Sequence, residues 1–241
     1  MLHDAELAFA LLTVVLAGWF RPWRMLKGPL LSPFLAGVVL LPWFWVLPQM
    51  LPSTLQAGGV AVQLSGASLL TLMLGWPLAV VALSCVAGVT WVAGQLSFEA
   101  WLSQWVWMGL MPAGAAVLVG AVLRRWLPSQ VFVYIFGRGF LGTALCMFGA
   151  GVLYEWAHHL VGSVTAEEAL VARWLMAWGD AVLTGMIVAI FVAFKPEWLA
   201  TWSDRRYLQK SPAGAENAPA QAPDAPPAVV LPPDKPDRPP R

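Results

Sequence analysis

The stretch of sequence that decides the fold is ALVARWLMAWGDAVLTGMIVAIFVAF, Ala169–Phe194. It is long enough to cross a bilayer as one helix, which takes about 20 mostly apolar residues. Asp180 nevertheless lies near its middle, where a charged side chain costs about 2.5–3.5 kcal/mol on insertion scales. We therefore expect Asp180 to face the interior of a helix bundle. Its role is either a structural hydrogen bond to a neighbouring helix or a direct part in function.

The composition of the whole chain is that of a polytopic membrane protein. Of its 241 residues, 59% are hydrophobic and only 11% are charged, which is far more apolar than a soluble domain. The formal net charge is +1, and no basic stripe is interleaved with aromatic residues. We therefore expect membrane lipid around the protein and no binding to nucleic acid.

The positions of the basic residues predict the topology. Clusters of arginine and lysine follow the first, fifth and last apolar runs, at 21–27, 124–125 and 195–210. Because basic loops of membrane proteins stay in the cytoplasm, the amino end is expected outside and the carboxyl end inside. The predicted fold class is all-α, a membrane bundle of about seven transmembrane helices in the bacterial cytoplasmic (inner) membrane.

Two segments differ from simple membrane spans. Gln63–Trp76 is short for a membrane helix, and we expect a tight turn at Gly75 to join it to the next apolar run. Phe98–Trp107 is expected to form a separate segment at the outer interface, with its three tryptophans in the aromatic belt of the membrane.

The chain changes character near residue 200. We expect residues 1–200 to form the transmembrane helical domain and residues 201–241 to form a cytoplasmic basic segment and a tail. Ten of the 20 prolines lie in Ser211–Arg241, together with alanine and mixed charge. Such a composition cannot bury a core, so a disordered tail is predicted.

Polar residues in or beside the apolar runs are candidates for a pore or for the second shell of a binding site. They are Gln63, Gln104, Arg138, Arg173, Asp180 and Thr184. On a helix, Thr184 lies one turn from Asp180 on the same face, and Arg173 lies two turns before it. Arg138 either pairs with Asp180 or extends toward the inner end of its own helix, and we favour the second because Asp180 lies deeper.

Several stretches, in this order, resemble the CbiM-like permeases of energy-coupling factor transporters. QLSGASLLTLMLGWPLAVVAL, Gln63–Leu83, is similar to the H-L-x-G-x-x-L-x-x-x-L-x-G-x-W region of that family. GDAVLTGM, Gly179–Met186, is similar to its G-E-x-x-I-T signature. FVYIFGRGFLGTAL, Phe132–Leu145, and the stretches KPEW and DRRYL at 195–198 and 204–208 are closer to an uncharacterised branch of the family.

The resemblance covers most of the chain from residue 63 to residue 210. It implies a helical membrane subunit that captures cobalt or nickel ions at its extracytoplasmic mouth. It also implies partners, a transmembrane coupling subunit and ATPases. The ligands of that family are the free amino terminus, a histidine at position two and a second histidine before the L-x-G motif. This chain has Leu2 and Gln63 at the last two positions. Arg173 replaces the histidine that precedes the signature acid, and Asp180 replaces the glutamate itself.

The start of the chain, Met-Leu-His, offers a different metal site. The amine of Met1, the amide nitrogens of Leu2 and His3 and the His3 ring form an all-nitrogen square plane, a geometry suited to Cu(II) or Ni(II). Such a site needs no second histidine. The alternative is that His3 is an ordinary polar residue at an outer terminus.

A weaker metal site lies at the outer end of the sixth run. Glu155 precedes His158 and His159 by three and four residues, so it could form a ligand pair with one of them. The two histidines are about 100° apart on a helix and cannot both reach one ion. An interfacial cap of the helix is the other interpretation.

The sequence therefore favours a permease or substrate-binding subunit for a divalent transition metal, with Ni(II), Co(II) or Cu(II) as substrate and no certain cofactor. The alternative is a non-transporting assembly or regulatory protein that kept the fold and lost the metal ligands. An enzyme is not predicted, because a single intramembrane acid and the lack of a nucleophile paired with histidine match no common catalytic arrangement.

Overall fold

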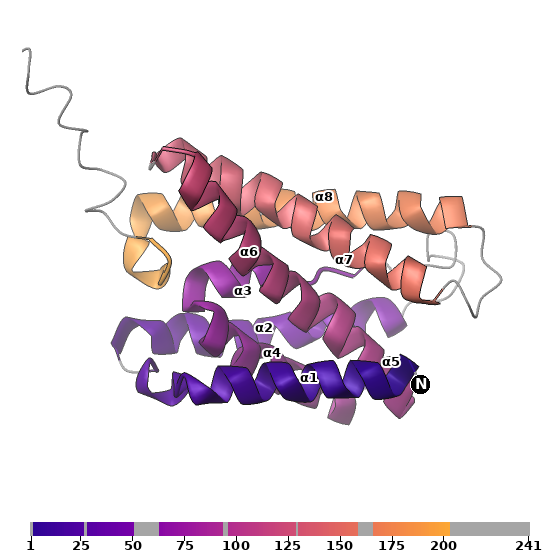
Figure 1. Ribbon diagram of the computed structural model, residues 1–241. Helices are drawn as coiled ribbons and strands as arrows, with labels where there is room; N and C mark the ends of the chain where they lie inside the picture. The colour runs from indigo at the N-terminus through magenta and orange to yellow at the C-terminus, as the bar shows by residue number, and fades with distance from the viewer. Residues whose placement is uncertain are drawn as a thin grey trace, which may run out of the picture. The chain divides into compact units, whose positions relative to one another are not determined.

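The computed structural model describes residues 2–26, 28–50, 63–93, 96–128, 130–158 and 166–202, and the elements that they form are helices (Figure 1). The α-helices are α1 (Leu2–Trp19), α2 (Leu31–Met50), α3 (Ala67–Leu74), α4 (Trp76–Ala93), α5 (Phe98–Gln104), α6 (Met111–Trp126), α7 (Gly142–His158) and α8 (Ala166–Phe194). Two π-helical segments, η4 (Trp105–Leu110) and η5 (Val133–Leu141), continue into α6 and α7, and short 3-10 turns occupy Pro22–Arg24, Gly28–Leu30 and Pro196–Trp198.

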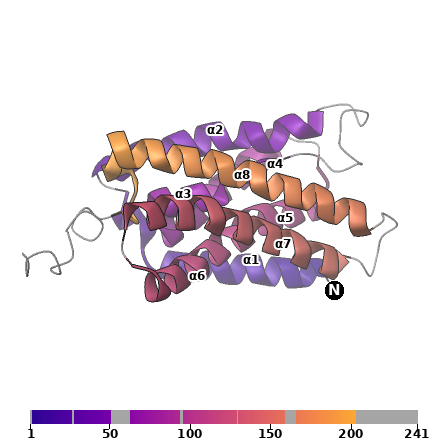
Figure 2. The same cartoon turned by 90° about the horizontal axis from the view of Figure 1, so that it is seen from above.

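In the described part of the chain, six helices are long and apolar enough to cross a membrane. The protein is therefore a multi-pass membrane protein with an all-helical fold. The spans run nearly side by side (Figure 2). The start of α1, the start of α5 and the end of α7 meet at one end of the bundle, which we name the amino-terminal end. Of the predicted cytoplasmic segment and tail, residues 201–241, only Thr201 and Trp202 are described.

The predicted separation of Phe98–Trp107 from the following helix is wrong. α5, η4 and α6 form one helical span of 29 residues, Phe98–Trp126. The π-helical segment lies just before Pro112, which has no N–H for the α-helical pattern. A change of hydrogen-bond register therefore keeps the span continuous through the proline.

The short third run crosses the bundle in an unusual way. Only α3 is helical in this run, and eight residues rise about 12 Å, which is too little for a membrane span. Gln63 lies at the amino-terminal end beside Gln104, whereas Met73 accepts a hydrogen bond from the Ala200 amide beyond the far end of α8. Residues 63–74 thus lead from one end to the other, as a non-helical piece followed by α3. The expected turn is present, with Gly75 at φ +78° between α3 and α4.

Glycines allow α7, η5 and α8 to pack closely. A β-carbon on Gly185 would lie 3.2 Å from the β-carbon of Phe140, and one on Gly151 would lie 3.2 Å from the β-carbon of Arg173. Small residues are common where membrane helices approach each other. This packing fixes Arg173 of α8 beside α7, close to the pocket at the amino-terminal end.

Candidate functional site

A pocket of about 230 Å³ lies at the amino-terminal end of the bundle. It is lined by Gln63, Leu96, Ala100, Ser103, Gln104, Trp107, Met108, Tyr154 and Arg173. Three of the residues that the sequence singles out, Gln63, Gln104 and Arg173, therefore meet in one place. They come from the segment before α3, from α5 and from α8, so the pocket exists only when the bundle is assembled.

The amides of Gln104 and Gln63 are joined across the pocket. Gln104 Nε2 donates to Gln63 Oε1 at 3.3 Å and to the carbonyl oxygen of Trp45 at 3.4 Å. The hydroxyl of Ser103 is buried and has no hydrogen-bond partner among the described residues. The pocket thus presents amide and hydroxyl groups to a small polar guest.

Arg173 is held on two sides. Its Nε donates to Glu155 Oε1 at 3.2 Å, and its guanidinium carbon lies 4.5 Å from the centroid of the Tyr154 ring. Glu155 therefore compensates the positive charge of Arg173 beside the pocket. No ion pair joins Glu155 to His158, both of them described residues, and the alternative pair of Glu155 with His159 stays a prediction because His159 lies outside the described residues.

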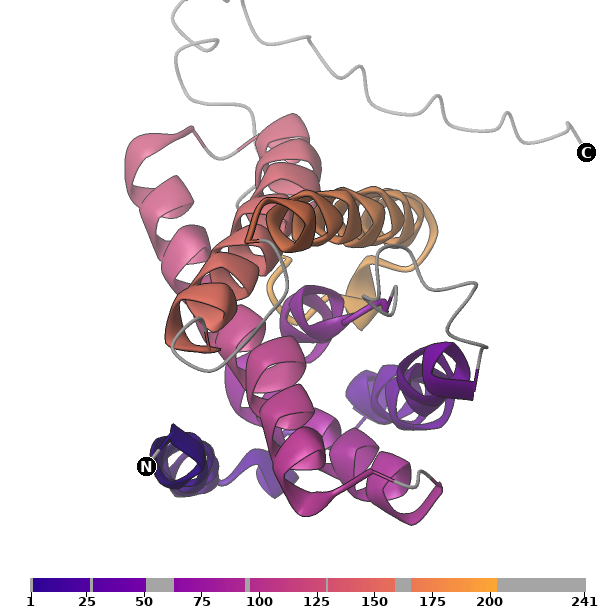
Figure 3. The ribbon, with the colours of Figure 1, turned by 90° about the vertical axis from the view of Figure 1, so that its right-hand side faces the viewer.

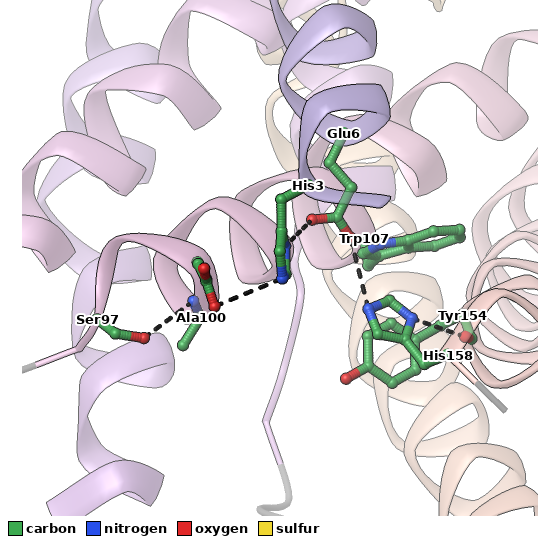
Figure 4. A network of polar contacts seen from close by, with 8 residues as sticks. His3, Glu6, Ser97, Ala100, Trp107, Tyr154 and His158 are labelled. Carbon is green, nitrogen blue, oxygen red and sulfur yellow. Dashed lines mark hydrogen bonds and ion pairs between the residues drawn. The ribbon is translucent and has the colours of Figure 1, made fainter. Parts of the chain in front are cut away.

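A second polar cluster, centred on Glu6, adjoins the pocket (Figure 4). Glu6 of α1 is only 3% exposed, and it accepts a hydrogen bond from Nε1 of Trp107. Its other contacts are with His3, where Oε2 lies 3.3 Å from Nδ1, and with His158, where Oε1 lies 3.6 Å from Nε2. The second ring nitrogen of His3 lies 3.5 Å from Glu99 Oε2. This Glu6 cluster ties α1 to the spans that carry Trp107 and His158.

The predicted metal ligands are placed in different ways. Met1 and His159 lie outside the described residues, so the four-nitrogen site stays a prediction. Leu2 and His3 form the first turn of α1, and the His3 ring contacts Glu6 and Glu99. Nδ1 of His158 donates to the carbonyl oxygen of Tyr154 at 2.9 Å. In the part of the chain that the structure describes, no group of three or more His, Cys, Asp or Glu side chains is arranged to hold a metal ion.

The three tryptophans expected in the aromatic belt of the membrane are half-buried, and each contacts other side chains or backbone of the bundle. Trp101 donates from Nε1 to the carbonyl oxygen of Ala87 at 2.7 Å and stacks on Trp105, with 5.5 Å between the ring centroids. Trp107 lines the pocket and donates to Glu6. Trp101 thus contacts α4 and Trp107 contacts α1, and their expected place in a membrane belt stays a prediction.

Asp180 faces the bundle interior, as predicted, with 1% of its surface exposed. Its Oδ1 accepts a hydrogen bond of 3.3 Å from the backbone amide of Gly66, just before α3, and the Ser65 backbone lies close as well. Non-helical backbone at membrane depth is tolerated only where protein satisfies its polar groups. Asp180 therefore forms a hydrogen bond of the structural kind that the sequence anticipates, to an amide of the non-helical backbone before α3, and a part in function stays a prediction.

Two further side chains form hydrogen bonds with the non-helical backbone just before α3, which we call the break. Trp45 Nε1 donates to the carbonyl oxygen of Ser65 at 3.1 Å. The hydroxyl of Ser65 donates to the carbonyl oxygen of Met108 and accepts from the amide of Ala67. The break is thus secured by α2, η4 and α8 together.

The last two candidates are also buried. Thr184 is 1% exposed and, like Asp180, lines an apolar cavity. Arg138 is 8% exposed, and its guanidinium carbon lies 5.4 Å from the ring centroid of Tyr134, one turn toward the start of its helix. Arg138 Nε and Nη1 have no hydrogen-bond partner within the described residues. The contact with Tyr134 lies toward the start of this helix, which is its predicted inner end, and no ion pair joins Arg138 to Asp180, both of them described residues.

Sequence reasoning missed Glu6 and Ser65 as organising residues. For Glu6 a signal existed, because an acid three residues after His3 and inside an apolar run is costly to bury without partners. For Ser65 no local signal marks the role, since its partners Trp45 and Met108 come from other helices.

A search of protein-family models, of curated proteins and of solved structures finds no match to this chain in any of the three.

We expect Glu6→Ala to destabilise the fold by about 1–3 kcal/mol, because it removes a buried carboxylate and leaves the indole N–H of the half-buried Trp107 without its acceptor. Thermal unfolding of the detergent-purified protein, followed by circular dichroism, measures the loss. Glu197→Ala is the control, since Glu197 is an exposed acid away from the Glu6 cluster. Equal melting temperatures for the two variants would show that the Glu6 cluster does not stabilise the bundle.

Proposed function

We propose that this chain is the substrate-binding membrane subunit, or permease, of an energy-coupling factor type transporter, with a divalent transition-metal ion of the cobalt or nickel type as its substrate. The observation that carries the proposal is the convergence of Gln63, Gln104 and Arg173 on one pocket. Gln63 and Arg173 stand at the two positions where the CbiM-like sequences that this chain resembles have histidines. These two positions, which are far apart in the sequence, therefore line the same pocket.

The amino terminus supports the same assignment. His3 contacts Glu99 of α5, and Ala100 of the same helix lines the pocket. The start of the chain thus lies at the same end of the bundle as the pocket (Figure 1). In this proposal Met1, Leu2 and His3 hold the ion through nitrogen atoms, and the pocket residues receive or pass it on. Compensation of Arg173 by Glu155 removes one source of repulsion against a cation.

The proposal includes a topology and partners. The amino end faces outward, the carboxyl end faces the cytoplasm, and residues 63–74 provide the seventh crossing in the inner membrane of a bacterium. The chain has no phosphate-binding glycine loop followed by lysine. Energy for transport would therefore come from ATPases through a transmembrane coupling subunit.

Titration calorimetry tests the metal site directly. Detergent-purified protein with an untagged, verified amino terminus is titrated with Ni(II), Co(II) and Cu(II). We expect one-to-one binding, weakened at least tenfold, at a rough estimate, by His3→Ala or by acetylation of the terminal amine. His158→Ala is the control, because this histidine also contacts Glu6 but supplies no nitrogen to the proposed plane. Binding that survives both changes at the terminus would exclude the proposed site.

A second function is favoured by one contact. The ring of His3 is already engaged by Glu6 and Glu99, which suits an assembly or regulatory protein that keeps the fold without a metal. In that case no ion binds in the titration, and the protein is recovered from membranes together with a stable partner complex.

A further inference from the structure

An apolar cavity of about 380 Å³ lies between α2, α3 and α8. Figure 3, which views the bundle along its length, shows these three helices around one corner of it. Among the described residues, the cavity shares no lining residue with the pocket at the amino-terminal end. Its volume is within the usual range for sites that hold small molecules, roughly 300–1,000 Å³.

The cavity opens toward lipid. Leu40 and Phe44 of α2 and Leu183 of α8 line it, and they are also 59%, 44% and 39% exposed on the surface of the bundle. These residues belong to membrane-spanning helices, so their exposed faces meet acyl chains. A guest can therefore enter between α2 and α8 from the bilayer, without passing through the polar pocket.

One acid lies in this apolar wall. Asp180 lines the cavity, and its Oδ2 is buried without a hydrogen-bond partner in the described part of the chain. Its other oxygen, Oδ1, accepts from Gly66. Among the described residues that line the cavity there is no lysine, arginine or histidine, and Thr184 and Trp198 supply the only other polar side-chain atoms of that described lining. The cavity therefore has a vacant hydrogen-bond acceptor beside a large apolar space. Because an unpaired acid inside the membrane is costly, a ligand that donates to Oδ2 would be stabilised there.

We propose that this cavity binds a lipophilic ammonium compound, a molecule with an apolar body and a single amine head. The apolar body contacts the side chains of α2, α3 and α8, and the ammonium group donates to Asp180 Oδ2. An ammonium group donates a hydrogen bond and carries a charge opposite to that of the Asp180 carboxylate. An alcohol offers only a neutral donor, and a carboxylate ligand is repelled. The inference does not depend on the proposed metal site, because the two sites have different linings and different ligand chemistry.

The experiment measures binding of radiolabelled octylamine to the full-length protein in lipid nanodiscs, with empty nanodiscs as the blank and 1-octanol and octanoate as competitors. We expect octylammonium to bind at least about tenfold more tightly than octanol, since a hydrogen bond to a charged group is worth more than a neutral one. Asp180→Asn keeps an acceptor for Gly66 and removes the charge. In this variant the affinity for octylammonium should fall to that for octanol.

Two further variants complete the test. Ala36→Phe fills the cavity from α2 while Asp180 is intact, so it should weaken octylammonium and octanol alike. Glu197→Gln removes an exposed acid next to Trp198 and should leave binding unchanged. If Asp180→Asn does not fold, loss of binding in Ala36→Phe still supports the site.

Several results would overturn the inference. They are equal affinities for octylammonium and octanol in the unaltered protein, binding that survives Ala36→Phe, or no saturable binding, in which case lipid or a partner helix occupies the cavity. Metal titration of Asp180→Asn separates the two proposals, because failure of one site leaves the signal of the other in place.

Discussion

Trp45→Ala is expected to lower the free energy of unfolding by about 3–5 kcal/mol, the usual cost of truncating a fully buried large aromatic residue. Trp45 is 0% exposed, and its ring packs 3.2 Å from the position that a β-carbon would take on Gly109. Its indole N–H also satisfies the carbonyl oxygen of Ser65 at the break before α3. The variant therefore creates a cavity and leaves a buried carbonyl without its donor.

Two comparisons separate these causes. Trp45→Phe keeps most of the ring volume but cannot donate, so its loss should be smaller than that of Trp45→Ala. Trp43→Ala removes a ring that is 68% exposed on the same helix and should have little effect. Unfolding by dodecyl sulfate in mixed micelles, followed by circular dichroism, gives all three values. A loss for Trp45→Ala no greater than that for Trp43→Ala would contradict the assignment of Trp45 to the core.

Gly66→Ala should cost roughly 2–5 kcal/mol, from backbone strain and a steric clash together. Gly66 has φ +63°, a conformation in which other residues are strained, and a β-carbon there would collide with Cδ1 of Leu41. The clash is relieved either by rotation of the Leu41 side chain, which also lines the apolar cavity, or by a shift of the Gly66 backbone. Because the Gly66 amide donates to Asp180, a backbone shift would also weaken the contact between α8 and the break.

Gly75→Ala is the matched control for this variant. Gly75 has φ +78°, but no heavy atom lies within 4 Å of the position of its added β-carbon. Its cost should be the backbone strain alone, about 1–2 kcal/mol. The same unfolding assay compares the two glycines. Equal losses of unfolding free energy would show that the Leu41 side chain moves aside at no cost. The close approach of α2 to Gly66 would then contribute nothing to stability.

The sequence by itself determined the helical membrane fold, the burial of Asp180 and the turn at Gly75. Each of these depends on a local property, because about 20 apolar residues, one acid within them and one glycine at a helix end act mainly through their immediate neighbours. The expected orientation and the tail rest on the same kind of local signal, the distribution of basic residues and prolines.

Local reasoning failed where a residue's neighbours come from other helices. The segment Phe98–Trp107 carries Glu99, Gln104 and several tryptophans, a composition typical of a membrane interface. In the structure α1 supplies Glu6 as the acceptor for Trp107, and Gln63 pairs with Gln104. Those partners allow polar and aromatic residues to pack between helices as part of one long span.

The tertiary structure alone decided which polar groups meet. Gly66 and Asp180 are 114 residues apart, and Glu6 and Trp107 are 101 apart. The cavity beside Asp180 likewise exists only because α2, α3 and α8 leave space between them. Hydropathy places a side chain inside or outside the bundle, but the choice of partner depends on helix rotation and packing, and these are properties of the whole bundle.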